Sequence, residues 1–306
     1  PYIYVPNRES AAIAADEMEA VLSENADDDV LTPVLPAKES LFPILQEATL
    51  TAEDRSLIER FYEKLPWLLY QGDEPIVGRS FRVELLPGAT PTRCKNRALA
   101  PAVRDFLEEC RVNWLRAGYI TPIATEVEWC SFVFVVPKPG SEGYRAVVDY
   151  VAVNKQTRPA TYPMPFLDTD HDSLNKAKYF GLLDLLKGYR QAETEPSTSN
   201  ILAIMLLNRV YAVNRLFEGP TNAVSFFQSV FKETLQQPLT DAQQAEIASE
   251  QPPDELQGHG YANDAKQIRL WIDDSMIHAP SVREFIQLLW RILIRLRDAR
   301  LRLNLK

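Results

Sequence analysis

Three aspartates lie at predicted strand ends, and their placement is typical of metal-dependent phosphoryl transfer. Asp184 ends an apolar run, while Asp273 and Asp274 lie between two further apolar segments, 268–272 and 275–279. A charge at the end of a buried strand is costly unless something compensates it. Converging carboxylates repel one another, and divalent cations relieve that repulsion. Two Mg²⁺ ions about 3.5–4 Å apart would activate an attacking 3′-oxygen and stabilise a leaving pyrophosphate.

The order of predicted elements explains how these distant acids could meet. From residue 178 the patterns predict a strand, a helix over 220–236, a strand pair, a helix from Ser281 and a closing strand in RLRLNLK. This order is typical of a ferredoxin-like split βαβ fold, in which the first and third strands are neighbours. An Asp-Asp pair also occurs in ordinary solvated turns. A generic ferredoxin-like binding domain with an accidental acidic pair therefore remains an alternative.

The preceding residues predict further helices and strands. Residues 51–64 begin with a Thr-x-x-Asp capping signature and continue with helical spacing. The run 81–88 predicts a strand that ends at a Pro-Gly turn. Residues 101–117 predict an amphipathic helix that Gly118 terminates. Segments 131–138 and 143–150 predict a β-hairpin.

Composition places the chain among globular proteins. It has 306 residues, of which 46% are hydrophobic and 25% are charged, close to the globular average. No apolar stretch approaches a membrane span of about 20 residues, and no signal peptide is visible. Three cysteines and three histidines are too scattered for a disulfide framework or a zinc site. We expect an intracellular protein, cytoplasmic or nuclear and not secreted, without a membrane partner.

The net charge of −9 is unevenly distributed. Residues 1–54 hold 12 acids and 2 bases, and residues 239–264 hold 6 acids and no base, whereas the last segment, 283–306, has 7 bases and 2 acids. Residues 1–54 are interpreted as an acidic tail or linker, and 237–266 as an exposed acidic loop. A globally acidic chain usually argues against nucleic-acid binding, but that argument weakens because the remaining body is mildly basic.

Eight sequence blocks, in order, resemble the reverse transcriptase of gypsy-type LTR retrotransposons and, more distantly, the retroviral enzymes. They are ELLPGATPTRCKNRALAP, LRAGYITP, FVFVVPKPGSEGYRAVVDYVAVNKQT, YPMPFLDT, LNKAKYFGLLDLLKGYRQ, GPTNAVSFFQ, WIDDSMIHA and RLRDARLRLN. The resemblance implies an α+β fold, the fingers and palm of a right-hand polymerase, with a ferredoxin-like split βαβ palm and an antiparallel sheet. It places the fingers mainly in 55–177 and the palm mainly in 178–306. Thumb and RNase H are expected to be absent, as in a polyprotein fragment.

The resemblance also implies residue roles, a cofactor and partners. Asp184, Asp273 and Asp274 match the catalytic, metal-binding aspartates, with two Mg²⁺ ions, or Mn²⁺, as the cofactor. The expected substrates are an RNA or DNA template–primer and dNTP, and the acidic tail or insert could bind a protein partner. Tyr189 matches the aromatic gate that excludes a 2′-hydroxyl, although it could equally be a core residue. The other residues expected to bind nucleotide or template are Lys138, Arg145, Asn222 and Gln228.

Several positions depart from the family pattern. Trp271 stands where Tyr is usual, Glu218 places an acid near the expected nucleotide pocket, and Val151 replaces an arginine. A carboxylate in that pocket would repel a triphosphate. Lys138 and Arg145 could be ordinary exposed cations. The alternative function is thus a domesticated, weakly active or inactive module that serves as a protein- or RNA-binding scaffold.

Overall fold

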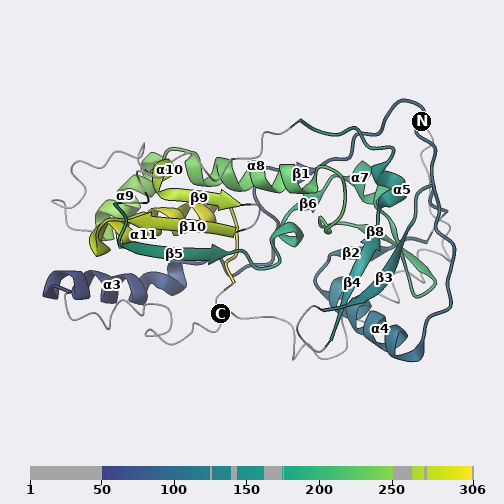
Figure 1. The fold of residues 1–306 in the computed structure, drawn as a ribbon, viewed down its shortest axis with the longest axis horizontal. Helices are drawn as coiled ribbons and strands as arrows, with labels where there is room; N and C mark the ends of the chain where they lie inside the picture. The colour runs from purple at the N-terminus through teal and green to yellow at the C-terminus, as the bar shows by residue number, and fades with distance from the viewer. Residues whose placement is uncertain are drawn as a thin grey trace. The chain divides into compact units, whose positions relative to one another are not determined.

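The computed structural model describes residues 50–124, 126–138, 143–161, 174, 176–250, 264–271 and 274–304. These residues form two compact units (Figure 1). The first unit contains the described residues of 78–161 and 189–223. The second unit contains the described residues of 50–77, 174–188 and 224–304. Most of the acidic segment 1–54 lies outside the described residues.

The sheet of the second unit has the predicted ferredoxin-like strand order. Strand β10 (Asp274–Ala279) lies between β5 (Tyr179–Asp184) and β9 (Ile268–Trp271), antiparallel to both. A single antiparallel bridge joins Leu303 to Leu185 on the other side of β5. The closing segment therefore adds a single bridge in place of the predicted full strand. Counted along the chain as β5, β9, β10 and the bridge at Leu303, the strands lie side by side in the order fourth, first, third, second. This is the order of a split βαβ sheet.

Helix α11 (Val282–Asp298) forms much of the core of the second unit. The apolar residues at its predicted inner positions are all buried, because helical spacing brings them to one face. Gly181 of β5 lies against this helix: a Cβ added there would stand 2.8 Å from the Phe285 ring. The inner positions of α11 are Phe285, Leu288, Leu289, Ile292, Leu293 and Leu296.

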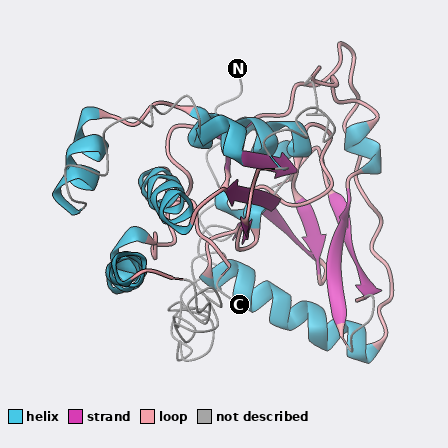
Figure 2. Cartoon of the chain, turned by 60° about the vertical axis from the view of Figure 1, so that its left-hand side comes forward, coloured by secondary structure: helices cyan, strands magenta, loops and turns pink. Residues whose placement is uncertain are grey.

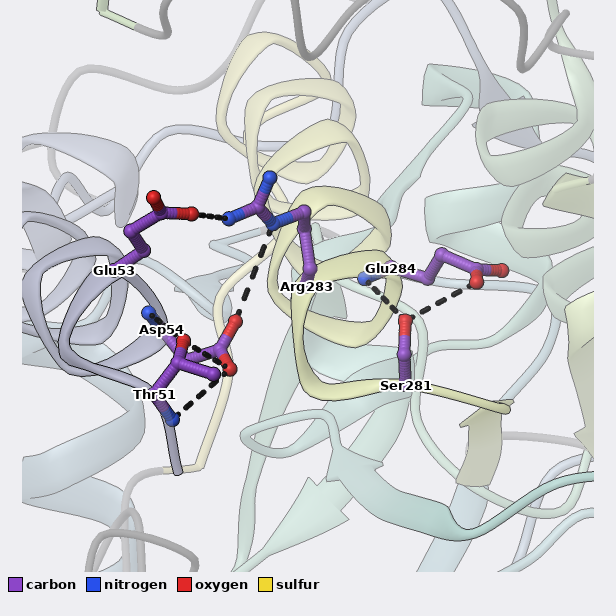
Figure 3. Close-up of polar contacts among 6 residues, drawn as sticks. All are labelled: Thr51, Glu53, Asp54, Ser281, Arg283 and Glu284. Atoms are coloured by element: carbon purple, nitrogen blue, oxygen red, sulfur yellow. Dashed lines mark hydrogen bonds and ion pairs between the residues drawn. The ribbon is translucent and has the colours of Figure 1, made fainter. Parts of the chain in front are cut away.

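Helix α3 (Ala52–Leu68) packs against α11. The Phe61 ring lies 5.5 Å from that of Trp290, edge to face. Figure 3 shows the adjacent starts of the two helices, where the Thr51 hydroxyl accepts the Asp54 N–H and Ser281 accepts the Glu284 N–H. These bonds confirm the capping signature at Thr51 and the helix start at Ser281.

An ion pair joins the two helix starts. Arg283 donates to Glu53 at 2.9 Å and lies 4.0 Å from Asp54. The Glu53 carboxylate is largely exposed, so the pair contributes modestly to stability, about 0–1 kcal/mol. It orients α3 on α11, while buried apolar contact supplies most of the stabilisation.

The interpretation of 237–266 as a loop is wrong for both of its ends. Helix α9 (Asp241–Glu250) buries Ile247, and the four-residue helix α10 (Asp264–Gln267) leads directly into β9. Glu246 of α9 pairs with Arg297 of α11 at 2.7 Å. The acidic composition suggested solvation, but basic residues of α11 provide partners for these acids. Residues 251–263, between the two helices, lie outside the described part of the chain.

A buried ion cluster fixes the second end of this insert. Asp264 is 2% exposed, and it accepts hydrogen bonds from Arg291 at 2.7 Å and from Arg295 at 3.1 Å. Arg295 also donates to the carbonyl oxygen of Gln237. Two guanidinium groups of α11 are thus removed from water against one carboxylate, and each depends on that carboxylate for compensation.

The first unit is built on a five-stranded sheet whose strands are coloured magenta in Figure 2. Its hairpin of β3 and β4 confirms the prediction over 131–150, and β3 also pairs in parallel with β7. Helix α4 (Pro101–Arg116) packs against β2 and β4, and Gly118 follows it at φ +65°. In sheet order the strands are β2 (Ile120–Pro122), β8 (Arg209–Val213), β7 (Ile204–Leu206), β3 (Ser131–Pro137) and β4 (Tyr144–Asp149).

Short elements complete the first unit. The predicted strand 81–88 is reduced to β1 (Ser80–Phe81), which pairs in parallel with β6 (Glu193–Thr194), and to one bridge at Leu85. The remaining helices are α5 (Val151–Asn154), the 3₁₀-helix η2 (Gly188–Gln191) and α7 (Pro196–Ile201). No helix of the described part of the chain is long and apolar enough to cross a membrane.

Candidate active site

The sheet register brings two of the three predicted acids together. Asp184, the last residue of β5, is the direct Cα partner of Asp274, the first residue of β10. Directly opposed residues of an antiparallel pair have Cα atoms about 4.5–5.5 Å apart. Residues separated by 90 peptide bonds are therefore neighbours at one end of the sheet. The third acid, Asp273, lies outside the described residues, but it is bonded directly to Asp274.

Asp184 is exposed because the side chains of β5 point alternately to the two faces of the sheet. Half-buried residues alternate with exposed ones along the strand, and Asp184 falls on the exposed face. Phe180 and Leu182 precede it on that face, with 55% and 82% of their surface exposed. The opposite face packs toward α11, as the contact of Gly181 with Phe285 shows. The acid therefore lies at the rim of an open sheet face, where a bulky substrate could reach it.

Asn304 holds Asp184 in place through two hydrogen bonds. Its side-chain Nδ2 donates to Oδ2 of Asp184 at 2.7 Å, and its backbone N–H donates to the Asp184 carbonyl oxygen at 2.8 Å. The second bond belongs to the short pairing around Leu303 and Leu185. Asn304 is not among the site residues that the sequence predicts. The signal was present, because the fourth strand of a split βαβ sheet lies beside the first.

The arrangement suits a hard divalent cation, although the structure describes only part of it. Carboxylate oxygens are the ligands that Mg²⁺ and Mn²⁺ accept. Within the described residues, no group of three or more His, Cys, Asp or Glu side chains is arranged to hold a metal ion. Asp273, the residue expected to complete such a group, is outside those residues.

The two predicted phosphate-binding cations lie on the β3–β4 hairpin of the first unit. Lys138 follows β3, and Arg145 of β4 is the Cα partner of Val136. Both side chains are exposed, as a residue that meets a phosphate must be. The main chain of Lys138 is fixed by a hydrogen bond from its N–H to the Gly143 carbonyl oxygen at 3.0 Å. Their role in binding nucleotide stays a prediction.

The other predicted nucleotide residues have different surroundings. Tyr189 lies in η2 and is half-buried. Asn222, at φ +73°, accepts the Ala160 N–H at 2.7 Å and donates to the Arg158 carbonyl oxygen at 2.9 Å, so it ties two loop segments together. A nucleotide would have to compete with those two bonds.

Gln228 of α8 (Ala223–Gln236) is a fully buried amide. Neither its Oε1 nor its Nε2 has a hydrogen-bond partner among the described residues. Leaving a buried polar group unpaired costs about 1–3 kcal/mol. Packing alone therefore does not explain why an amide side chain occupies this position. Direct contact with a nucleotide requires Gln228 to become exposed.

Glu218, the acid expected to disturb the nucleotide pocket, compensates a buried cation. Arg190 is 7% exposed, its guanidinium lies over the Phe217 ring, and its Nη2 donates to Glu218 at 3.0 Å. Burial lowers the pKa of Arg190, and the negative charge of Glu218 opposes that change. The Arg190 Nη1 finds no partner among the described residues. The expected repulsion by Glu218 is therefore reduced by a cation at hydrogen-bond distance.

We expect Glu218→Ala to lower the free energy of unfolding by about 1 kcal/mol, because Arg190 loses its charged partner. The effect is limited because 61% of the Glu218 side chain is exposed. Urea denaturation followed by circular dichroism measures it. Glu193→Ala, an exposed acid of β6, is the control. An equal or smaller loss for Glu218→Ala than for the control would contradict the pairing.

Comparisons with known proteins agree with the resemblance. No family model matches the chain. The chain is 32% identical, over 151 residues, to the retrovirus-related Pol polyprotein from transposon opus of Drosophila melanogaster, a match that covers 48% of this chain and 15% of the relative. It is 30% identical, over 142 residues, to the corresponding polyprotein from transposon gypsy of the same organism, covering 45% of this chain and 14% of the relative.

Solved structures that superimpose on this chain include the foamy viral protease-reverse transcriptase. The foamy viral protease-reverse transcriptase in complex with double-stranded DNA superimposes with a TM-score of 0.59 at 18% identity, covering 88% of this chain and 42% of that one. The same enzyme in complex with an RNA/DNA hybrid superimposes with a TM-score of 0.59 at 17% sequence identity. That match covers 88% of this chain and 32% of the viral chain. The resemblance to retrotransposon reverse transcriptases and the α+β fold are thus confirmed.

Proposed function

We propose that this chain contains the fingers, mainly 55–177, and the palm, mainly 178–306, of an RNA-directed DNA polymerase. The observation that carries the proposal is the register that sets Asp184 opposite Asp274 at the end of the palm sheet. The relatives are Pol polyproteins of retrotransposons. The chain spans only 14–15% of their length, so the activity and the substrates are inferred for this part alone.

The acids at the sheet end would act as ligands rather than as proton carriers. Asp184, Asp273 and Asp274 would hold two divalent cations, which supply charge neutralisation for the attacking 3′-oxygen and the leaving pyrophosphate. Asn304 would keep the Asp184 carboxylate oriented. Catalysis of this kind depends mainly on positioning and on electrostatic stabilisation, as in other phosphoryl transfers.

Residues of the first unit would bind the substrates. The exposed Lys138 and Arg145 have the charge to bind triphosphate oxygens, and a guanidinium can do so with two parallel hydrogen bonds. Tyr189 would pack under the sugar and reject a 2′-hydroxyl. The polymer substrate would be a primed RNA or DNA template; the two foamy viral structures hold double-stranded DNA and an RNA/DNA hybrid.

Primer extension on an RNA template tests this proposal. Purified chain, a labelled primer and dNTPs should give extension with Mg²⁺ or Mn²⁺, none with EDTA, and extension again when the cation is restored in excess. A folded protein that binds the primed template but never extends it would favour the scaffold alternative. Measuring binding at several salt concentrations separates phosphate contacts from non-electrostatic binding.

We expect Asn304→Ala to raise the Mg²⁺ concentration for half-maximal extension by about tenfold, a typical effect of removing a residue that orients a metal ligand. The physical reason is the lost Nδ2 hydrogen bond to Asp184. Mn²⁺ binding, followed by electron paramagnetic resonance without substrate, should weaken by a similar factor.

Asn200→Ala is the matched control, because Asn200 is an exposed asparagine on α7. Its cation requirement should equal that of the wild type. If Asn304→Ala lowers the maximal rate but leaves both cation measurements unchanged, Asn304 does not act through the metal ligand.

A further inference from the structure

Two cysteines of the first unit lie side by side on adjacent segments. The Sγ atoms of Cys94 and Cys130 are 3.8 Å apart. Their main chains are also paired: the Cys94 N–H donates to the Cys130 carbonyl oxygen at 2.8 Å, and the Cys130 N–H donates to the Thr92 carbonyl oxygen at 3.0 Å. Arg93 and Cys130 form a parallel bridge. Both backbones are therefore fixed where the two side chains meet.

The separation of the two sulfurs is within reach of a disulfide. The parallel bridge pairs Cys130 with Arg93, and Cys94 is the next residue along that segment, joined to Cys130 by its own main-chain hydrogen bond. Bond formation requires the sulfurs to approach from 3.8 Å to about 2.05 Å, a change that side-chain rotation can supply.

The two thiols differ in accessibility. Cys130 is 5% exposed, and Cys94 is half-buried. Burial raises the pKa of Cys130 to about 12. Burial also raises the pKa of Cys94, and its hydrogen bond with Cys130 opposes that increase. Cys94 is thus the thiol that an oxidant in solution reaches first.

We propose that Cys94 and Cys130 are an oxidation-sensitive thiol pair, which closes to an intramolecular disulfide by exchange with a small disulfide such as oxidised glutathione. The Cys94 thiolate attacks one sulfur of the small disulfide, forming a mixed disulfide and releasing one thiolate. The Cys130 sulfur, after losing its proton, attacks Cys94 Sγ and displaces the second small thiol. Two protein thiols are oxidised, and one disulfide is reduced to two thiols.

The closed disulfide would link the segment that precedes α4 to the residue just before β3, and the closed ring would contain residues 95–129 with α4 and β2. Cross-links that close loops stabilise the folded state mainly by restricting the unfolded chain. The oxidised protein should therefore melt several degrees above the reduced one. Burial raises the pKa of both thiols, so exchange near neutral pH should be slow.

The test exposes the full chain to defined ratios of reduced and oxidised glutathione, blocks remaining thiols and maps peptides by mass spectrometry. Wild type and Cys110→Ser should each lose two reactive thiols and yield a linked peptide pair containing residues 94 and 130. A thiol reductant should reverse both changes. Cys130→Ser should instead retain glutathione on Cys94.

Some outcomes would overturn the pairing. If oxidised Cys110→Ser keeps both thiols reactive across the whole series, or carries glutathione on Cys94 without a linked peptide, the two sulfurs do not join. Linkage between two chains, recognised by doubled mass on a non-reducing gel, would also contradict an intramolecular bond. The wild-type peptide map does not depend on the folding of any variant.

Discussion

Replacing Asp184 by asparagine is expected to reduce primer extension on the order of a thousand-fold, the scale on which a main electrostatic group at a reacting centre contributes. Asparagine keeps the shape of the side chain but removes the charge that two cations require. Asp184 is exposed, and an amide oxygen can still accept the hydrogen bond from Asn304. The melting temperature should therefore be nearly unchanged. Single-nucleotide incorporation under excess enzyme measures the rate.

Three companion variants make this result specific. Asp273→Asn and Asp274→Asn should lose activity to a similar extent, because all three acids are expected to serve the same cations. Asp105→Asn, an exposed acid on α4, should extend primers at the wild-type rate. Equal extension by the wild type and Asp184→Asn would remove the basis of the polymerase proposal.

The largest effect on stability is expected from Asp264→Ala, about 3–5 kcal/mol of unfolding free energy. Removing this carboxylate leaves the guanidinium groups of Arg291 and Arg295 facing one another in a buried position. Neither group can regain its hydration without moving α11 or the insert. Urea denaturation followed by tryptophan fluorescence gives the free energy of unfolding. A lower urea midpoint with an unchanged dependence of that free energy on urea concentration identifies lost stability.

Rescue variants separate charge from packing at Asp264. Replacing Asp264, Arg291 and Arg295 together by apolar residues of similar volume should recover much of the loss, because no buried charge remains uncompensated. Asp241→Ala, an exposed acid at the start of α9, should cost less than about 1 kcal/mol. A loss of that small size for Asp264→Ala would show that both guanidinium groups stay hydrated.

The sequence predicted the sheet of the second unit well because local patterns and topology agreed. The apolar runs before Asp184 and on both sides of Asp273 are short, which favours strands, and the helical stripe from Phe285 to Leu296 required a buried face. Split βαβ topology then placed β5 beside β10. The opposition of Asp184 and Asp274 followed from these elements and did not require knowledge of any side-chain contact.

Other features depend on distant partners that a single sequence does not reveal. The acidic composition of 237–266 suggested solvation, yet α9 and α10 are docked because α11 supplies arginines on a facing surface. Asn304 is polar in a predicted strand, and only the pairing with β5 gives it a role. The strand expected over 81–88 shrank to two residues because its partners are short, the two residues of β6 and a single bridge between Leu85 and Thr157.

The separate docking of α9 and α10 has a practical consequence for labelling experiments. Each of the two helices has its own ion pair with α11, so a label that reports on one helix should be insensitive to the release of the other.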